Sequence, residues 1–178
     1  MDFVLRAATL ADIPALERLI AASTRGLSRA DYTDAQIEAA LGSAMGVDSE
    51  LIRDGTYFVV EAEGQLVGCG GWSRRRTLFG ADAGSGRESA LLDPSHEAAR
   101  IRAFFVHPDR ARRGIGRLLL DHCEAEARAH GFTAAELMAT LPGQRLYRVC
   151  GYVAGVPVQH PLGDGLTIEF VPMRKGFA

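Results

Sequence analysis

Residues 101–120, IRAFFVHPDRARRGIGRLLL, constrain the fold of this chain more than any other stretch. A β-type apolar run ends at Pro108, a short loop carries Gly114 and Gly116, and a helical apolar pattern follows at once. A strand that leads through a short loop into a helix is typical of α/β proteins. The first N–H groups of such a helix have no partner within it, and glycines let a ligand approach them. The segment therefore predicts a site for a phosphate or pyrophosphate.

Arginines crowd around this loop although the whole chain carries little net charge. The 178 residues include 20 basic and 22 acidic side chains, which gives a formal net charge of −2. Within residues 100–117, six arginines stand against one acid, Asp109. The low total argues against a nucleic-acid partner or a membrane surface, and the local excess predicts one focused anion site. Lys175 is the only lysine, so phosphate binding would depend on arginine or backbone N–H groups.

Two common phosphate-binding motifs do not match the loop. A P-loop has lysine and then serine or threonine after its last glycine, whereas Arg117 and Leu118 follow Gly116 here. A dinucleotide-binding fingerprint has glycine or alanine three residues after its second glycine, where this chain has Leu119. A Rossmann nucleotide-binding enzyme and a plain glycine turn with solvated arginines are kept as alternatives.

The rest of the sequence alternates helical and strand patterns, without internal repeats or linkers. A capping box of Thr33 and Gln36 begins one helix, and Glu63-Gly64 joins two strands as a hairpin. Helical patterns cover residues 9–20, 33–41, 115–130 and 142–150, with a helical turn at 48–54, and strand patterns cover 3–7, 56–62, 65–73, 101–107, 134–140, 152–159 and 166–173. We predict a single α/β domain over residues 1–178, with a mixed, mostly antiparallel sheet of about seven strands and about four helices.

Cysteine usage and hydropathy predict a cytoplasmic protein without a metal. Cys69, Cys123 and Cys150 form neither a disulfide framework nor a metal-ligand spacing, which is typical of a reducing compartment. The N-terminus lacks the basic start and apolar run of a signal peptide. No window approaches the ~18–20 apolar residues of a transmembrane helix, so no membrane partner is expected.

Two motifs together make the chain similar to the GNAT (GCN5-related) N-acetyltransferase family, which uses acetyl-CoA. The family motif of Gln or Arg, two residues, Gly, one residue, and Gly or Ala falls on Ala111, Gly114 and Gly116, with Ala111 as the departure. The second motif, residues 146–152, reads LYRVCGY and is like the family's LYxxxGF/Y. The resemblance is plain over residues 58–156 and implies a GNAT-like fold for the whole chain.

The resemblance implies an acetyl-CoA site formed by a strand, the loop of the first motif and Thr140, with no metal. The pantetheine arm would pair with the backbone of one strand segment, Phe104, Phe105 and Val106. The pyrophosphate would be held by the loop and the start of the helix: Arg112, Arg113, Gly114, Ile115, Gly116 and Arg117. Thr140 stands where many members of the family carry an asparagine that contacts the cofactor.

The resemblance also implies that Tyr147 is the general acid that protonates the departing thiolate. A phenol has a pKa near ~10, close to that of an alkyl thiol, so proton transfer between them is nearly balanced. The alternative for Tyr147 is an aromatic core residue on a short helix. No cysteine is placed as an obvious nucleophile, although Cys150 lies three residues on, so we expect direct transfer through a tetrahedral intermediate.

The acceptor side is predicted from residues before the cofactor motif. Trp72 lies late in a strand that should pair antiparallel with residues 102–106, and Tyr32 lies near the second helix; both are candidate substrate contacts. The alternative for Trp72 is a buried residue between a helix and the sheet. Residues 74–76 are either a solvated edge or an attraction for an acidic substrate, and residues 80–97 are either a mobile excursion or a substrate-side flap.

An amine must be neutral to attack a thioester, so a general base or a desolvated pocket is required. The sequence offers Glu61 and Glu63 on the early hairpin, and His107 and His122 beside the cofactor loop. His107 is expected to cap or pack, and His122 to be structural. A water chain to several carboxylates is equally open.

These observations predict a cytoplasmic, acetyl-CoA-dependent N-acetyltransferase. The acceptor could be an amino acid, a peptide N-terminus, a polyamine, an aminoglycoside or another small amine. The main alternative is a non-catalytic acyl-CoA-binding regulatory module on the same fold. The final strands could also pair two copies as a homodimer.

Overall fold

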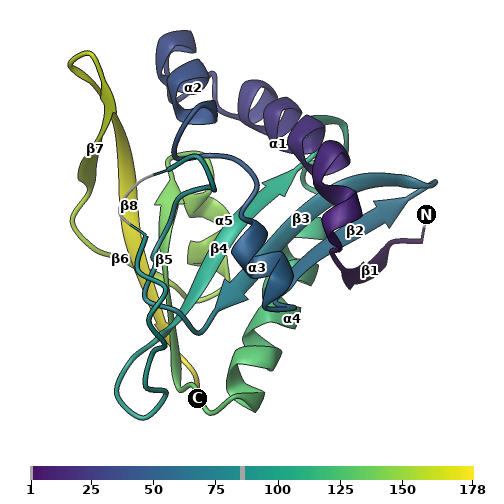
Figure 1. The fold of residues 1–178 in the computed structure, drawn as a ribbon, viewed down its shortest axis with the longest axis vertical. Helices are drawn as coiled ribbons and strands as arrows, with labels where there is room; N and C mark the ends of the chain where they lie inside the picture. Colours follow the sequence, from purple (N-terminus) through teal and green to yellow (C-terminus); the bar gives the residue numbers. More distant parts are fainter. Residues whose placement is uncertain (1, 85–86) are drawn as a thin grey trace.

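In the computed structural model, residues 2–84 and 87–178 are described and form one eight-stranded sheet with helices on both faces (Figure 1). The strand order is β1-β2-β3-β4-β5-β8-β6, and β7 pairs with β8. The strands are β1 (Val4–Ala7), β2 (Tyr57–Ala62), β3 (Gln65–Ser73), β4 (Ala99–Val106), β5 (Ala134–Thr140), β6 (Val153–Ala154), β7 (Val158–Gly163) and β8 (Leu166–Gly176). Only β4 and β5 pair in parallel, so within the described residues the predicted mixed, mostly antiparallel α/β sheet is confirmed.

Five α-helices and two 3-10 helices connect the strands in the described part of the chain. They are η1 (Leu10–Asp12), α1 (Ile13–Leu27), α2 (Asp34–Leu41), α3 (Ser49–Arg53), η2 (Pro108–Arg110), α4 (Ile115–Ala129) and α5 (Gln144–Val149). The predicted capping box begins α2, where the Gln36 N–H donates to Thr33 Oγ1 at 3.2 Å. None of these helices is long and apolar enough to cross a membrane.

One predicted segment is confirmed and another differs. The helical turn predicted at 48–54 is the helix α3, and the Asp48 side chain accepts the Glu50 N–H and caps its start. The strand predicted over 152–159 is divided into β6 and β7. The Gly155 N–H still donates to the opposite Pro172 carbonyl at 2.7 Å, but neither Pro172 nor Pro157 has an N–H to continue the pairing.

The core lies on both faces of the central strands, as their alternating side chains require. Val59 and Cys69 pack on the α1 side, whereas Phe58 and Val60 pack on the α4 side. A Cβ at Gly68 would lie 2.4 Å from Ile115 Cγ2. The glycine in β3 therefore lets the first residue of α4 pack directly on the sheet.

A buried ion pair fastens β8 to α4. Lys175 Nζ donates to both carboxylate oxygens of Glu124, at 2.8 and 3.0 Å, and the Tyr152 hydroxyl donates to the same carboxylate at 3.0 Å. Glu124 is buried, so these donors compensate the loss of water around its charge. The chain's one lysine is thus a structural residue.

The expected role of Trp72 as a substrate contact is wrong. Its side chain is fully buried, its Nε1 donates to Glu126 Oε2 of α4 at 2.9 Å, and its ring packs against His130 and Phe132. The strand pairing itself is as predicted, since β3 is antiparallel to β4 and Trp72 faces Ile101. Trp72 points to the α4 side of the sheet, where it serves the core.

We predict that Trp72→Phe lowers the free energy of unfolding by about 1–3 kcal/mol, because a smaller ring leaves a cavity and Glu126 loses a donor. Urea denaturation measures this change. Acetyl-CoA affinity, measured by calorimetry, should stay unchanged. Weaker acetyl-CoA binding with an unchanged free energy of unfolding would contradict the core role and support a role for Trp72 in the site.

Candidate active site

A gap between β4 and β5 forms the centre of the site. The two strands pair only at Ala99 with Ala135 and Arg100 with Glu136, and then diverge. Ala103 has a φ of 55°, and the register of β4 against β3 shifts beside it, so β4 bulges at this point. The buried Tyr57 hydroxyl donates to the Ala103 carbonyl at 2.9 Å and holds the bulge.

The edge of β4 that faces this gap carries backbone groups available to a ligand. The His107 N–H donates to the Val67 carbonyl of β3 at 2.9 Å, so by alternation the N–H groups of Phe104 and Val106 face the other way. The Val106 N–H already donates to Ser23 Oγ of α1 at 3.2 Å, so a ligand would pair with the Phe104 N–H or replace the serine at Val106. This edge suits an extended ligand that pairs with backbone groups, as a strand would.

A cleft of about 560 Å³ extends from this edge to the start of α4. Every residue expected to contact acetyl-CoA or to act as the acid lines it, except Arg113, which is exposed outside it. The lining residues from that expectation are Phe104, Phe105, Val106, Arg112, Gly114, Ile115, Gly116, Arg117, Thr140 and Tyr147. The fold thus brings both sequence motifs to one cavity.

The loop before α4 presents free backbone donors to this cleft. Arg112 and Gly114 have φ values of 61° and 86°, a left-handed conformation that turns the chain sharply into the helix. The Leu118 N–H is the first to bond within α4, at 2.9 Å to the Gly114 carbonyl. The N–H groups before it lie at the positive end of a 15-residue helix, which favours a bound anion.

The arginines around the loop divide between this cleft and ion pairs elsewhere. Arg112 and Arg117 line the cleft, and so does Arg145 of α5, which the sequence did not single out. Three others pair with carboxylates from distant segments: Arg100 with Glu136, Arg102 with Asp48, and Arg110 with Glu63. The positive charge available to a ligand is therefore smaller than the crowding of arginines predicted.

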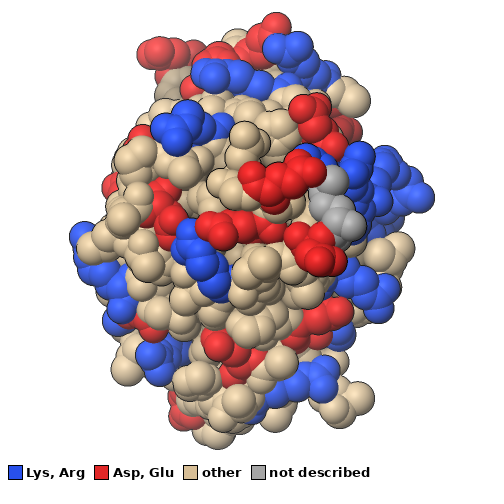
Figure 2. Space-filling model, turned by 90° about the vertical axis from the view of Figure 1, so that its right-hand side faces the viewer, with Lys and Arg blue, Asp and Glu red and all other residues tan. Residues whose placement is uncertain are grey.

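The arginine run at residues 74–76 lies outside both cavities described here. Arg75 pairs with Asp54 at 2.7 Å and Arg76 with Glu97 at 2.5 Å, as expected for a solvated edge of the sheet. Basic and acidic side chains are likewise interspersed over the face beside β1 (Figure 2).

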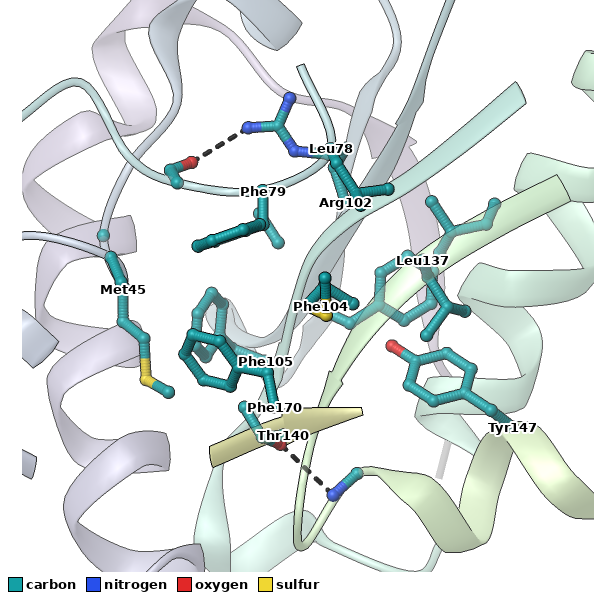
Figure 3. Close-up of a pocket in the computed structure, with 17 residues that line it drawn as sticks. Met45, Leu78, Phe79, Arg102, Phe104, Phe105, Leu137, Thr140, Tyr147 and Phe170 are labelled. Carbon is teal, nitrogen blue, oxygen red and sulfur yellow. Dashed lines mark hydrogen bonds between the residues drawn. The ribbon is translucent and has the colours of Figure 1, made fainter. Parts of the chain in front are cut away.

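A second, smaller pocket of about 100 Å³ adjoins the cleft. Six residues contribute to the walls of both cavities: Met45, Phe104, Phe105, Thr140, Gly143 and Tyr147. Figure 3 shows the Tyr147 hydroxyl pointing into this pocket. The Gly143 N–H donates to Thr140 Oγ1 at 3.2 Å, which fixes the turn between β5 and α5. The boundary between the two cavities is where two reactants would meet.

Tyr147 is a neutral phenol at this boundary. Burial raises the pKa of its hydroxyl well above the ordinary value, because the charged form would lose its water. Within the described residues the hydroxyl has no hydrogen-bond partner, and no buried side-chain polar atom is left unsatisfied there. The hydroxyl is therefore open to the cavity and available to donate a proton.

Tyr32 is not a substrate contact. Its hydroxyl donates to the Glu169 carbonyl at 2.6 Å and accepts the Leu141 N–H at 2.9 Å, and burial raises its pKa to about 12. It lines neither cavity. Both of its hydrogen bonds tie the α1–α2 connection to β8 and the end of β5, a structural role that its sequence position did not reveal.

None of the four candidate bases lines either cavity. Glu61 pairs with Arg6 and Glu63 with Arg110, His107 caps η2 by accepting the Asp109 N–H at 3.2 Å, and the His122 ring packs on Phe58. Within residues 2–84 and 87–178, no group of three His, Cys, Asp or Glu side chains could hold a metal.

Sequence reasoning missed several residues of the cavities. Ser23 of α1, Met45 before α3, and Phe79 in the β3–β4 connection line them through contacts far apart in the chain. Phe79 belongs to no motif, and Ser23 stands within an amphipathic helix. The one available signal was the apolar Leu78-Phe79 pair just before the polar stretch of residues 80–97, of which 85–86 lie outside the described residues.

Comparisons with known proteins agree with this geometry. The family model "Acetyltransferase (GNAT) family" matches residues 16–152. None of the curated proteins matches the chain. A GCN5-related N-acetyltransferase from Rhodopseudomonas palustris has a similar structure, with a TM-score of 0.73, 21% identity, and coverage of 99% of this chain and 97% of that one.

Two further solved structures have the same fold. The PaiA N-acetyltransferase of Thermoplasma acidophilum, in complex with coenzyme A, has a TM-score of 0.67 and 14% identity, over 99% of this chain and 100% of that one. The ribosomal-protein-S18-alanine N-acetyltransferase of Escherichia coli has a TM-score of 0.60 and 13% identity, over 99% and 95%. With a family model that covers most of its length and the fold to match, this chain belongs to the GNAT family of acetyltransferases.

Proposed function

We propose that the protein transfers the acetyl group of acetyl-CoA to a primary amine by direct attack. The observation that carries the proposal is the meeting of a long cleft and a small pocket at the Tyr147 hydroxyl. The cleft has the parts that coenzyme A requires: a free strand edge for the pantetheine amides and helix N–H groups with arginines for the pyrophosphate. A reducing, cytoplasmic setting fits its three unpaired cysteines, Cys69, Cys123 and Cys150.

In the proposed reaction the thioester carbon lies at the boundary of the two cavities. The amine nitrogen attacks it, the new C–N bond forms, and the C–S bond breaks as the tetrahedral intermediate collapses. Tyr147 gives its proton to the departing sulfur, and the proton that the nitrogen loses on becoming an amide returns to the Tyr147 phenolate through water at the mouth. The described residues that line the two cavities include no carboxylate and no histidine, so the amine would enter neutral or lose its proton to water at the mouth.

The alternative, a non-catalytic acyl-CoA-binding module, is less well supported. Such a module needs only the cleft, whereas this protein has a second pocket that shares its walls and receives an unpaired phenol. Thiol release from acetyl-CoA over a broad panel of amines separates the two. Tight binding of acetyl-CoA without turnover of any amine would favour the module.

We predict that Tyr147→Phe lowers kcat by about 100-fold, because the thiolate must then leave without its acid. Acetyl-CoA affinity, measured by calorimetry, should stay within about twofold, since the ring that packs beside Phe104 is retained. Because burial raises the pKa of Tyr147, the wild-type acid should stay protonated at least up to about pH 10, without an activity loss from its ionisation below that pH.

Tyr32→Phe is the matched control for that experiment. It removes another buried tyrosine hydroxyl, but one that bonds only backbone groups. We expect lower stability and little change in kcat. Equal losses of kcat and of acetyl-CoA affinity in Tyr147→Phe would instead assign Tyr147 a packing role.

We predict that Gly114→Asp weakens acetyl-CoA binding by about 100-fold, because a carboxylate enters the anion site at the start of α4. A Cβ at Gly114 meets no atom within 4 Å, so the fold should persist. Gly114→Asn is the control: it adds similar bulk without charge, and asparagine tolerates a left-handed φ. Calorimetry should show a clearly smaller loss for Asn. Unchanged affinity in the Asp variant would place the pyrophosphate elsewhere.

A further inference from the structure

The small pocket beside Tyr147 restricts which amines the protein can use. We infer, on the basis of the proposed function, that the acceptor is a small monoamine with an apolar body: one primary amine and no second positive charge. This selects one of the acceptor classes that the sequence left open and excludes polyamines and aminoglycosides. Three features of the pocket carry the inference: its lining, its one charged residue and its size.

Most side chains that line the pocket are apolar, and none of the described ones is a carboxylate. Besides the aromatic residues that it shares with the cleft, its large apolar side chains include Met45, Leu78, Phe79, Leu137, Met138 and Phe170, and those labelled in Figure 3 surround the pocket. Neither Asp nor Glu is among its described lining residues. An ammonium group that enters it would lose water and gain no anionic partner, which is strongly unfavourable.

Among the described lining residues, the one charged side chain is a buried arginine. Arg102 donates to Asp48 Oδ2 at 2.6 Å, to the Gly80 carbonyl at 2.9 Å and to the Thr77 carbonyl at 3.2 Å. The fully buried Asp48 also forms an ion pair with Arg87, whose Nη2 lies 2.8 Å from Asp48 Oδ1. The nearest acid is therefore already shared by two guanidinium groups and is not available to a substrate cation.

The same arrangement leaves a second positive charge on the substrate without compensation. Asp48 already pairs with Arg102 and Arg87, so an ammonium group in the pocket would bear the full cost of losing its water. The reacting amine avoids this cost only if it is neutral at the Tyr147 end. A monoamine can meet that requirement, whereas a diamine or polyamine would carry a further ammonium into the apolar end.

The pocket is small and firmly built. At about 100 Å³ it is smaller than the ~150 Å³ cavity that accommodates benzene, so it fits an apolar body of about five heavy atoms. Phe79 stands edge-on to Phe170 of β8 and His160 of β7, with ring centroids 5.5 and 4.9 Å apart. The Thr77 N–H donates to the Glu88 carbonyl at 2.9 Å, which fastens the connection that carries Phe79. Rigid aromatic walls of this kind select by size.

The test compares pentylamine with 1,5-diaminopentane, which have the same carbon chain and differ by one ammonium. With acetyl-CoA as donor, we expect kcat/KM for pentylamine to exceed that for the diamine by about 100-fold. Spermidine, an aminoglycoside and an Ala-Ala-Ala tripeptide should rank below pentylamine. Calorimetry with protein saturated with coenzyme A gives a second readout, in which pentylamine should bind more tightly than the diamine.

Met138→Glu tests whether the missing carboxylate sets this preference. Met138 is half-buried on β5 and lines the pocket, so a glutamate there places a charge inside it. We expect the preference for pentylamine over the diamine to fall by at least about 10-fold. Met138→Gln adds a polar group of the same shape without charge and should keep the preference. Unchanged acetyl-CoA affinity shows that both variants are folded.

The outcomes distinguish this inference from the proposed function. A preference for the diamine, the tripeptide or the aminoglycoside with turnover would overturn the inference and leave acetyl transfer intact. Selective binding of pentylamine without turnover would support the pocket's selectivity and overturn the proposed reaction. If neither amine binds or reacts while acetyl-CoA binds, the inference is overturned.

Discussion

The parting of β4 from β5 is the constraint on which the other functional features depend. Two parallel strands that stop pairing after two residues expose backbone N–H and C=O groups that would be hydrogen-bonded in a continuous sheet. The bulge at Ala103, held by the Tyr57 hydroxyl, turns β4 away. The strand edge, the long cleft and the small pocket all follow from that divergence, and Tyr147 stands where the two cavities join.

Local chemistry made much of the fold and site predictable from sequence. The Thr33–Gln36 capping box, the strand before Pro108 and the glycine loop each depend on neighbours within a few residues, and the structure has all three. The motif that holds Tyr147 was identified by its resemblance to the GNAT family. These residues lie at the cleft because short loops leave α4 and α5 little freedom to pack elsewhere.

Long-range pairing explains what sequence reasoning could not supply. Trp72 was placed on the correct strand, but which face it enters depends on register and on the bulge opposite. Arg102 lies in the arginine-rich segment, yet its charge is neutralised by Asp48, which is 54 residues away. A count of charges that are close in sequence does not include partners that are distant in sequence. It therefore overestimated the positive charge at the anion site, and it did not reveal that Arg102 lines the acceptor pocket as part of an ion pair.

The pairing of Lys175 with Glu124 has a consequence for a protein that handles an activated acyl donor. Thioesters also acylate exposed lysines without an enzyme, provided that the amine is unprotonated and accessible. This chain has one lysine, and both oxygens of a buried carboxylate hold its ammonium, which has no lone pair to offer. The protein thus offers almost no lysine side chain for self-acylation. The ion pair between Lys175 and Glu124 therefore stays intact in the presence of the acyl donor.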